Sequence, residues 1–359
     1  MKTQKTIFYA AMAILFVMGG SAYAYQNIID LGTLTGNGSR ANGINASGQV
    51  VGCYYSKNYY TDERAFLYNG SQMTSLSALG GTKSDAFAIN NSGQVAGSSY
   101  TTGGSLHAFL YNGSTTTDLG TLGGSYSVAK SINASGQVVG FAAPASGSYY
   151  HAFLYSNSKM TDLGTLGGAE SYAYGINDSG QVVGYASNAG LGRHAFLYSG
   201  STMTDLGTLG GTASFAWGIN NSGQVVGDSY ITLASGFYHA YLYSGSTMTD
   251  LGTLGGTNSS AFGINDSGQV VGWSYTTGNA AQHAFLYSGS MKTDLNTLID
   301  PTLGWTLKVA TGINDSGQIC GYGDINGQEH AFLLTVPEPA SAILIGVGCL
   351  FARLRQRRR

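Results

Sequence analysis

Six histidines carry the side chains best suited to acid–base or metal chemistry, and all six occupy one position of an internal repeat. They are His107, His151, His194, His239, His283 and His330. Converging imidazoles could bind a metal ion. Because equivalent positions of successive repeats lie far apart unless they face a common axis, we instead expect each histidine to open a strand and cap a loop. The sequence therefore predicts no metal site and no lone catalytic histidine.

The acidic residues also give little support for catalysis. Most are periodic, either in turns or before the leucine that ends a repeat segment, as in Asp118 and Asp205. A glycosidase needs a singular pair of carboxyl groups. The nonrepeating acids are scattered and suggest no such pair: Asp62, Glu63, Asp85, Glu170, Asp228, Asp300, Asp324 and Glu329. The Asp-Ser-Gly turns lack the dense oxygen ligands of a calcium loop, and we find no phosphate loop, zinc spacing or nucleophile elbow. No cofactor is predicted.

Aromatic residues in variable loops are the best candidates for binding. The repeats diverge between their second and third strand-like segments, and loops on a rigid scaffold are where binding usually resides. Flat aromatic faces beside hydroxyls and amides suit sugar rings. The predicted binding residues, each of which could instead merely pack its loop, are Tyr54, Tyr100, Tyr150, Tyr230, Tyr238, Trp273 and Trp305.

A repeat of 43 to 45 residues, 49 at the last step, must position these side chains. Each copy contains Asn-x-Ser-Gly-Gln, for example at 177–181. A glycine with positive φ and an asparagine that bonds nearby amides are typical of a hairpin turn. The same letters could mark glycosylation, but seven placements at one turn favour the structural interpretation.

Each unit also holds four short segments rich in Val, Tyr, Phe and Thr, without an amphipathic helical stripe. Four antiparallel strands at this period predict a seven-bladed β-propeller over residues 25–336, an all-β fold. The last repeat lacks a fourth strand. Residues 25–33, which precede the first repeat, resemble the fourth-strand sequence of the other repeats. We therefore expect the N-terminal strand to close the ring, which a solenoid of the same period would not need. Small residues of the first strand, such as Ala173 and Gly175, should crowd near the axis.

The two ends of the chain have a different composition. Residues 1–24 combine a basic start, a short apolar run and Ala22-Tyr23-Ala24, which is typical of a secretory signal peptide; a membrane anchor would need a longer run. Residues 337–359 hold an apolar run followed by five arginines. They predict a short apolar helix, a short transmembrane segment that could anchor the chain transiently.

The charge argues against a nucleic-acid-binding protein, and the cysteine positions argue against a disulfide. Residues 26–336 contain nine basic and seventeen acidic residues, a net charge of −8, and clustered cations for nucleic acid are missing. Cys53 and Cys320 lie in equivalent strands one position out of register, so we expect two unpaired thiols rather than a disulfide.

Two resemblances bear on location. The sequence Val336-Pro337-Glu338-Pro339, the apolar run and the arginines resemble the PEP-CTERM sorting signal. This implies transient recognition of Pro337, Glu338 and Pro339 by an exosortase at the inner membrane, export, and association with exopolysaccharide or biofilm matrix. The body, from about Asp30 to Leu334, resembles the extracellular HAF-repeat family, named for triplets such as 194–196. That family implies no established activity.

We therefore expect a secreted, noncatalytic surface or matrix protein that binds exopolysaccharide or a partner protein through the variable rim of the propeller. The competing hypothesis is a glycan hydrolase or lyase with its site at the channel mouth.

Overall fold

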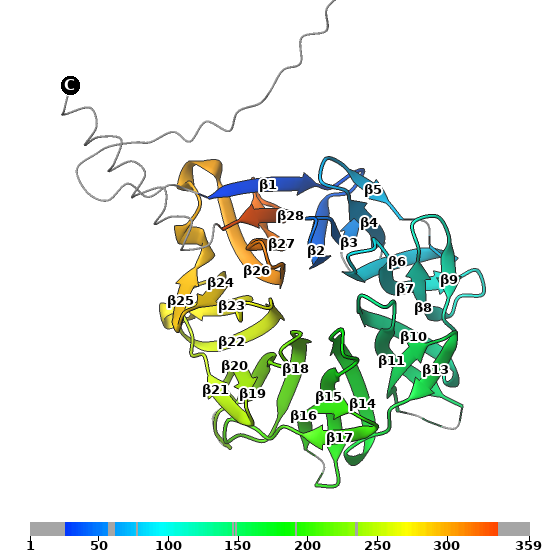
Figure 1. Ribbon diagram of the computed structural model, residues 1–359. Helices are drawn as coiled ribbons and strands as arrows, with labels where there is room; N and C mark the ends of the chain where they lie inside the picture. The colour runs from blue at the N-terminus through cyan, green and yellow to red at the C-terminus, as the bar shows by residue number, and fades with distance from the viewer. Residues whose placement is uncertain are drawn as a thin grey trace, which may run out of the picture.

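The computed structural model describes residues 26–336, except 57–61, 77, 146, 148, 191, 234 and 235. The described residues form seven four-stranded antiparallel sheets arranged as blades around a central channel (Figure 1). The predicted seven-bladed β-propeller is therefore confirmed. The predicted signal peptide, the apolar helix and the sorting motif lie outside the described residues. Within them, no helix is long and apolar enough to cross a membrane.

Each blade runs from an inner strand at the channel to an outer strand at the circumference (Figure 1). The inner strands are β2 (Gly38–Ile44), β6 (Gly80–Ile89), β10 (Gly123–Ile132), β14 (Gly167–Ile176), β18 (Ser214–Ile219), β22 (Gly255–Ile264) and β26 (Trp305–Ile313). The second strands are β3 (Val50–Tyr55), β7 (Val95–Thr101), β11 (Val138–Pro144), β15 (Val182–Asn188), β19 (Val225–Tyr230), β23 (Val270–Thr276) and β27 (Gln318–Ile325).

The third strands are β4 (Arg64–Tyr68), β8 (Leu106–Tyr111), β12 (His151–Ser156), β16 (Arg193–Ser199), β20 (Tyr238–Ser244), β24 (Gln282–Ser288) and β28 (Gln328–Thr335). The outer strands are short: β5 (Met73–Ser75), β9 (Thr116–Asp118), β13 (Lys159–Asp162), β17 (Thr202–Asp205), β21 (Thr247–Asp250), β25 (Met291–Asp294) and β1 (Asn27–Gly32). Three 3₁₀ turns, η1 (Thr277–Asn279), η2 (Leu295–Thr297) and η3 (Pro301–Leu303), flank β24–β26.

The N-terminal strand closes the ring as predicted. Strand β1 pairs antiparallel with β28, with Asn27 opposite Thr335 and Asp30 opposite Phe332. It supplies the outer strand of the last blade, whose other three strands come from the opposite end of the chain (Figure 1). Pairing this edge removes the unpaired strand on which an open array would aggregate.

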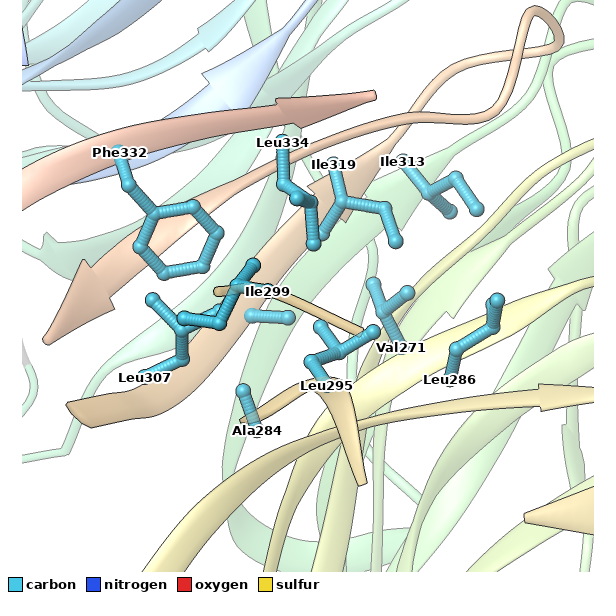
Figure 2. Close-up of a cluster of buried hydrophobic side chains, with 11 residues drawn as sticks. Val271, Ala284, Leu286, Leu295, Ile299, Leu307, Ile313, Ile319, Phe332 and Leu334 are labelled. Atoms are coloured by element: carbon cyan, nitrogen blue, oxygen red, sulfur yellow. The ribbon is translucent and has the colours of Figure 1, made fainter. Parts of the chain in front are cut away.

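The hydrophobic core is divided into clusters that lie between neighbouring blades. In the cluster between the sixth and seventh blades, Val271 and Leu286 face Ile319, Phe332 and Leu334 across the interface (Figure 2). The phenylalanine of each His-Ala-Phe triplet is fully buried at such an interface, as Phe332 is here. Because each sheet is covered on both faces, its strands are apolar on both sides and do not alternate cleanly.

The turn asparagines do more than shape their own hairpins. Asn177 accepts hydrogen bonds at Oδ1 from the backbone N–H of Gln181, as predicted for an Asx-type turn, and Gly180 has a φ of 78°. Its Nδ2 also donates to the carbonyl of Asn220 in the next blade, at 3.1 Å. The same bond recurs at every blade boundary, and Asn314 donates to Asn45 to complete the circle. Seven inter-blade hydrogen bonds therefore form a closed ring at this end of the channel.

The histidines pair with the periodic aspartates. Each His Nδ1 lies 2.6–2.9 Å from a carboxylate oxygen of the outer strand, as between His194 and Asp205. In the last blade His330 reaches Asp30 of β1. The expectation that the histidine caps a loop is thus wrong: the aspartate caps the turn, with Asp205 accepting from the N–H of Gly207, while the histidine binds the aspartate across the hairpin. Cys53 and Cys320 are buried and unpaired, as expected.

Tyr241 provides a test of the inter-blade packing. It stands where the other six blades have a buried phenylalanine, and its hydroxyl has no hydrogen-bond partner among the described residues. An unsatisfied buried hydroxyl destabilises by about 1–3 kcal/mol. We expect Tyr241→Phe to raise the free energy of unfolding in urea by about 1 kcal/mol, and the reverse change, Phe196→Tyr, to lower it. A destabilised Tyr241→Phe variant would contradict this packing.

Candidate functional site: an aromatic channel

A β-bulge in every inner strand aims one side chain into the channel. In β14, Ala173 pairs with Gly184 and Gly175 pairs with Val183, so Tyr174 is the extra residue between them. The same register shift occurs in the other six inner strands. Bulges redirect side chains and are frequent beside functional sites. The seven bulged residues are Asn42, Phe87, Lys130, Tyr174, Trp217, Phe262 and Thr311.

All seven bulged residues line a single cavity, which we call the channel cavity. Its volume is about 320 Å³, and Arg40, Val309 and Tyr322 complete its wall. The bulged side chains therefore occupy the channel axis. The small residues beside them crowd at the contacts between neighbouring blades. A Cβ on Gly218, for example, would lie 2.7 Å from the carbonyl oxygen of Phe262 in the next blade. Toward the turns lies a further cavity of about 210 Å³, which is lined by seven isoleucines, the turn asparagines and the residues that follow them.

Two cations face the channel cavity, and their surroundings differ. Arg40 forms an ion pair with Glu329, with Nε 2.5 Å from Oε1, and its guanidinium lies 4.6 Å from the Tyr322 ring centre. Lys130 instead places its Nζ 3.4 Å from the centre of the Phe87 ring. Burial lowers the pKa of the Lys130 ammonium to about 8, against the opposing effect of the Asp85 charge.

A second cavity of about 390 Å³, the rim cavity, shares Trp217 and Phe262 with the channel cavity. It unites three of the predicted binding residues, Tyr230, Tyr238 and Trp273. The Tyr238 ring centre lies 5.8 Å from that of Tyr230 and 6.2 Å from that of Trp273. The prediction of an aromatic binding surface thus coincides here with a formed cavity.

Asp228 is the acidic group of the rim cavity. Its Oδ1 accepts hydrogen bonds from Trp217 Nε1 at 2.5 Å and from Ser260 Oγ at 2.6 Å. Burial raises the pKa of Asp228 to about 6, because desolvation outweighs both hydrogen bonds. The carboxylate therefore orients the Trp217 indole at neutral pH.

A third cavity of about 320 Å³, the acidic cavity, shares Phe87 and Lys130 with the channel cavity. Glu63 and Asp85 both line it, together with the predicted binding residue Tyr100. The interpretation of the nonrepeating acids as scattered is therefore wrong for these two. Asn42 donates to Asp85 Oδ1 at 2.8 Å, and Glu63 Oε2 is buried without a hydrogen-bond partner among the described residues.

The remaining predicted binding residues lie outside these three cavities. Tyr150 packs in an aromatic cluster, 4.9 Å from Tyr126 between ring centres. Tyr54 contacts a hydrophobic core cluster, and its hydroxyl donates to Ser75. Trp305 packs on Phe332, with ring centres 6.2 Å apart. Tyr54 and Trp305 thus support the blades, as loop-packing aromatics do.

The sequence interpretation missed the bulged residues, although a signal was present. Each repeat contains Ala, a variable residue, a small residue, Ile and Asn, as in 173–177. The variable residue is the one that reaches the channel. A bulge interrupts the alternation of side chains along a strand, so the sequence pattern does not show which way the variable residue points.

No family model matches the chain, and no curated protein sequence matches it. Among solved structures, the chain is similar to a putative TolB from Agrobacterium tumefaciens, with 14% identity, a TM-score of 0.42, and coverage of 68% of this chain and 90% of that one. TolB from Acinetobacter baumannii is 13% identical, with a TM-score of 0.41 and coverage of 80% of each chain. A Trypanosoma rangeli sialidase is 9% identical, with a TM-score of 0.40 and coverage of 93% of this chain and 58% of the sialidase. The fold assignment rests on the strand pairing described above.

The raised pKa of Asp228 predicts a specific pH dependence of stability. The folded state holds this proton up to about pH 6, whereas the unfolded carboxyl loses it near pH 4, so stability falls as pH rises through this window. We expect Asp228→Asn to stabilise the protein at pH 7.5 by roughly 1–3 kcal/mol and to have a smaller effect at pH 4.5. Urea unfolding at both pH values measures this. Asp178→Asn, in an exposed turn, is the control. An equal effect of Asp228→Asn at both pH values would contradict the assignment.

Proposed function

We propose that this protein is a noncatalytic saccharide-binding propeller that acts outside the cell on exopolysaccharide. One observation supports this most: seven bulged side chains converge on a cavity whose wall holds five aromatic residues, two of which also line the rim cavity. Aromatic faces provide contact area for sugar C–H groups, while nearby amides, hydroxyls and charges bind the sugar hydroxyls. The cavity volumes fall in the range of ordinary ligand sites.

The proposed location follows from the two ends of the chain. The signal peptide would direct export, and Pro337, Glu338 and Pro339 would be read transiently by an exosortase at the inner membrane. The propeller would then be released to the surface or matrix. Fractionation of the native host tests this, because loss of the three-residue motif should leave the protein in the inner membrane fraction.

Binding through the rim cavity is tested with a glycan array and a polysaccharide pull-down. We expect Trp273→Ala and Tyr238→Ala each to lower the affinity for the bound glycan about tenfold, through loss of aromatic contact. Tyr149→Ala is the matched control, since Tyr149 lies on a loop at the same rim and is 56% exposed. Unchanged affinity in both cavity variants would contradict the proposal. Tight capture of a protein with no glycan binding would favour a protein-binding scaffold.

An enzyme remains the competing function, and one observation favours it. Glu63 and Asp85 line the same cavity, as a hydrolase's two carboxyl groups would. Incubation of the bound glycan with the protein, followed by assays for new reducing ends and for unsaturated products, distinguishes a hydrolase or lyase from a binding protein. Turnover that is abolished by Glu63→Gln would establish catalysis.

A further inference from the structure

We propose that Lys130 makes the channel cavity selective for acidic saccharides, with its ammonium binding a carboxylate of the sugar. This inference rests on the proposed function and specifies its ligand class. Lys130 is the bulged residue of β10, so the backbone itself aims its side chain at the channel axis. Of the seven bulged residues that line the channel cavity, Lys130 alone carries a charge.

The Lys130 ammonium lacks a partner for its donors. Its Nζ lies against the Phe87 ring at 3.4 Å and 5.9 Å from the Tyr174 ring centre. Among the described residues it has no hydrogen-bond acceptor and no ion-pair partner. An ammonium has three donors, and half-buried Lys130 directs them toward no acceptor in the described part of the protein. An anionic ligand would supply the hydrogen-bond acceptor and the negative charge that the Lys130 ammonium lacks.

The charge balance of the channel cavity points to an anion. Its wall contains Arg40 and Lys130 and no carboxylate. Arg40 is occupied, since Glu329 accepts from both Nε and Nη2. Asp85 influences Lys130 electrostatically from the adjoining acidic cavity, but its carboxylate accepts from Asn42. Lys130 is therefore the cation of the channel cavity that no carboxylate of the described residues pairs with directly.

The remaining wall fits a sugar that carries the anion. Trp217 and Phe262 offer apolar faces, and Asn42, Thr311 and Tyr322 bring polar groups. A uronic acid combines a pyranose C–H face, hydroxyls and one carboxylate in a single residue. Because Trp217 and Phe262 also line the rim cavity, the next sugar of a chain would extend toward Tyr238 and Trp273.

The test compares uronic acid oligosaccharides of the gluco, galacto and manno series with the same oligosaccharides after reduction of each carboxyl to hydroxymethyl. Titration calorimetry on the mature protein at pH 7 should show at least one acidic form bound about tenfold more tightly than its reduced counterpart. Lys130→Met, close in size but uncharged, should abolish this preference, so that the acidic and reduced forms bind with equal affinity. Lys292→Met is the matched control, because Lys292 lies 4.0 Å from the Phe285 ring centre and outside the three cavities.

The outcomes separate the two proposals. Equal binding of acidic and reduced forms, or a preference that persists in Lys130→Met, overturns the role of Lys130 but leaves saccharide binding intact. No binding of any saccharide overturns both. Loss of affinity for both forms in Trp273→Ala supports saccharide binding alone.

A pH titration of the native protein keeps the proposal falsifiable if Lys130→Met fails to fold. Lys130 is charged below about pH 8, so the preference for the acid should be present at pH 7 and decline above pH 8, the bound carboxylate shifting this loss upward. Around it, burial raises the pKa of Tyr126 and Tyr174. The other charged and titratable groups that line the two cavities with Lys130 are Arg40, Tyr100, Tyr322, Asp85, Glu63 and Lys83. A preference unchanged from pH 7 to about 9.5 would refute the assignment.

Discussion

The hydrogen bond from each turn asparagine to the next blade is the constraint on which this structure depends. One side chain fixes the hairpin of its own blade through Oδ1 and the position of the following blade through Nδ2, as Asn177 does between Gln181 and Asn220. A single residue type at one spacing therefore specifies both the local turn and the rotation between blades. The bond from Asn314 to Asn45 joins the two ends of the set, and only a closed circle of matching blades can satisfy all seven.

The ring explains why the inner strands can vary at one position. The constant turn asparagines hold one end of the channel, and the buried phenylalanines fill the interfaces between blades. The bulged residue contributes to neither task, because it points into the channel. Residues as different in size and charge as Asn42, Lys130 and Trp217 therefore occupy this position, and Asn42 adds hydrogen bonds to Asp85 and Ala86 of the next blade. Repetition thus builds the scaffold, and the departures from repetition build the site.

The fold followed from the sequence because its determinants are local and repeated. The Asn-x-Ser-Gly turn, the four strand segments and the surplus strand at 25–33 predict the blade count and the closure. The pairing of His194 with Asp205 was also within reach, since hairpin register places them close together across two strands. The residues of the channel were harder to predict from the sequence. A bulge changes side-chain direction without changing composition, so the sequence prediction overlooked the channel residues. It assigned Tyr54 and Trp305 to the binding rim, whereas both pack against the core.

Native-state hydrogen exchange of the seven turn glutamine amides, which all bond to the turn asparagines, tests the closed ring most directly. A ring held at every boundary unfolds as one unit, so Gln49 and Gln318 at the chain ends should exchange with the same free energy as Gln181 in the middle. Lower free energies at Gln49 and Gln318, by about 1 kcal/mol or more, would show that the terminal blades fray as in an open array and would contradict the account.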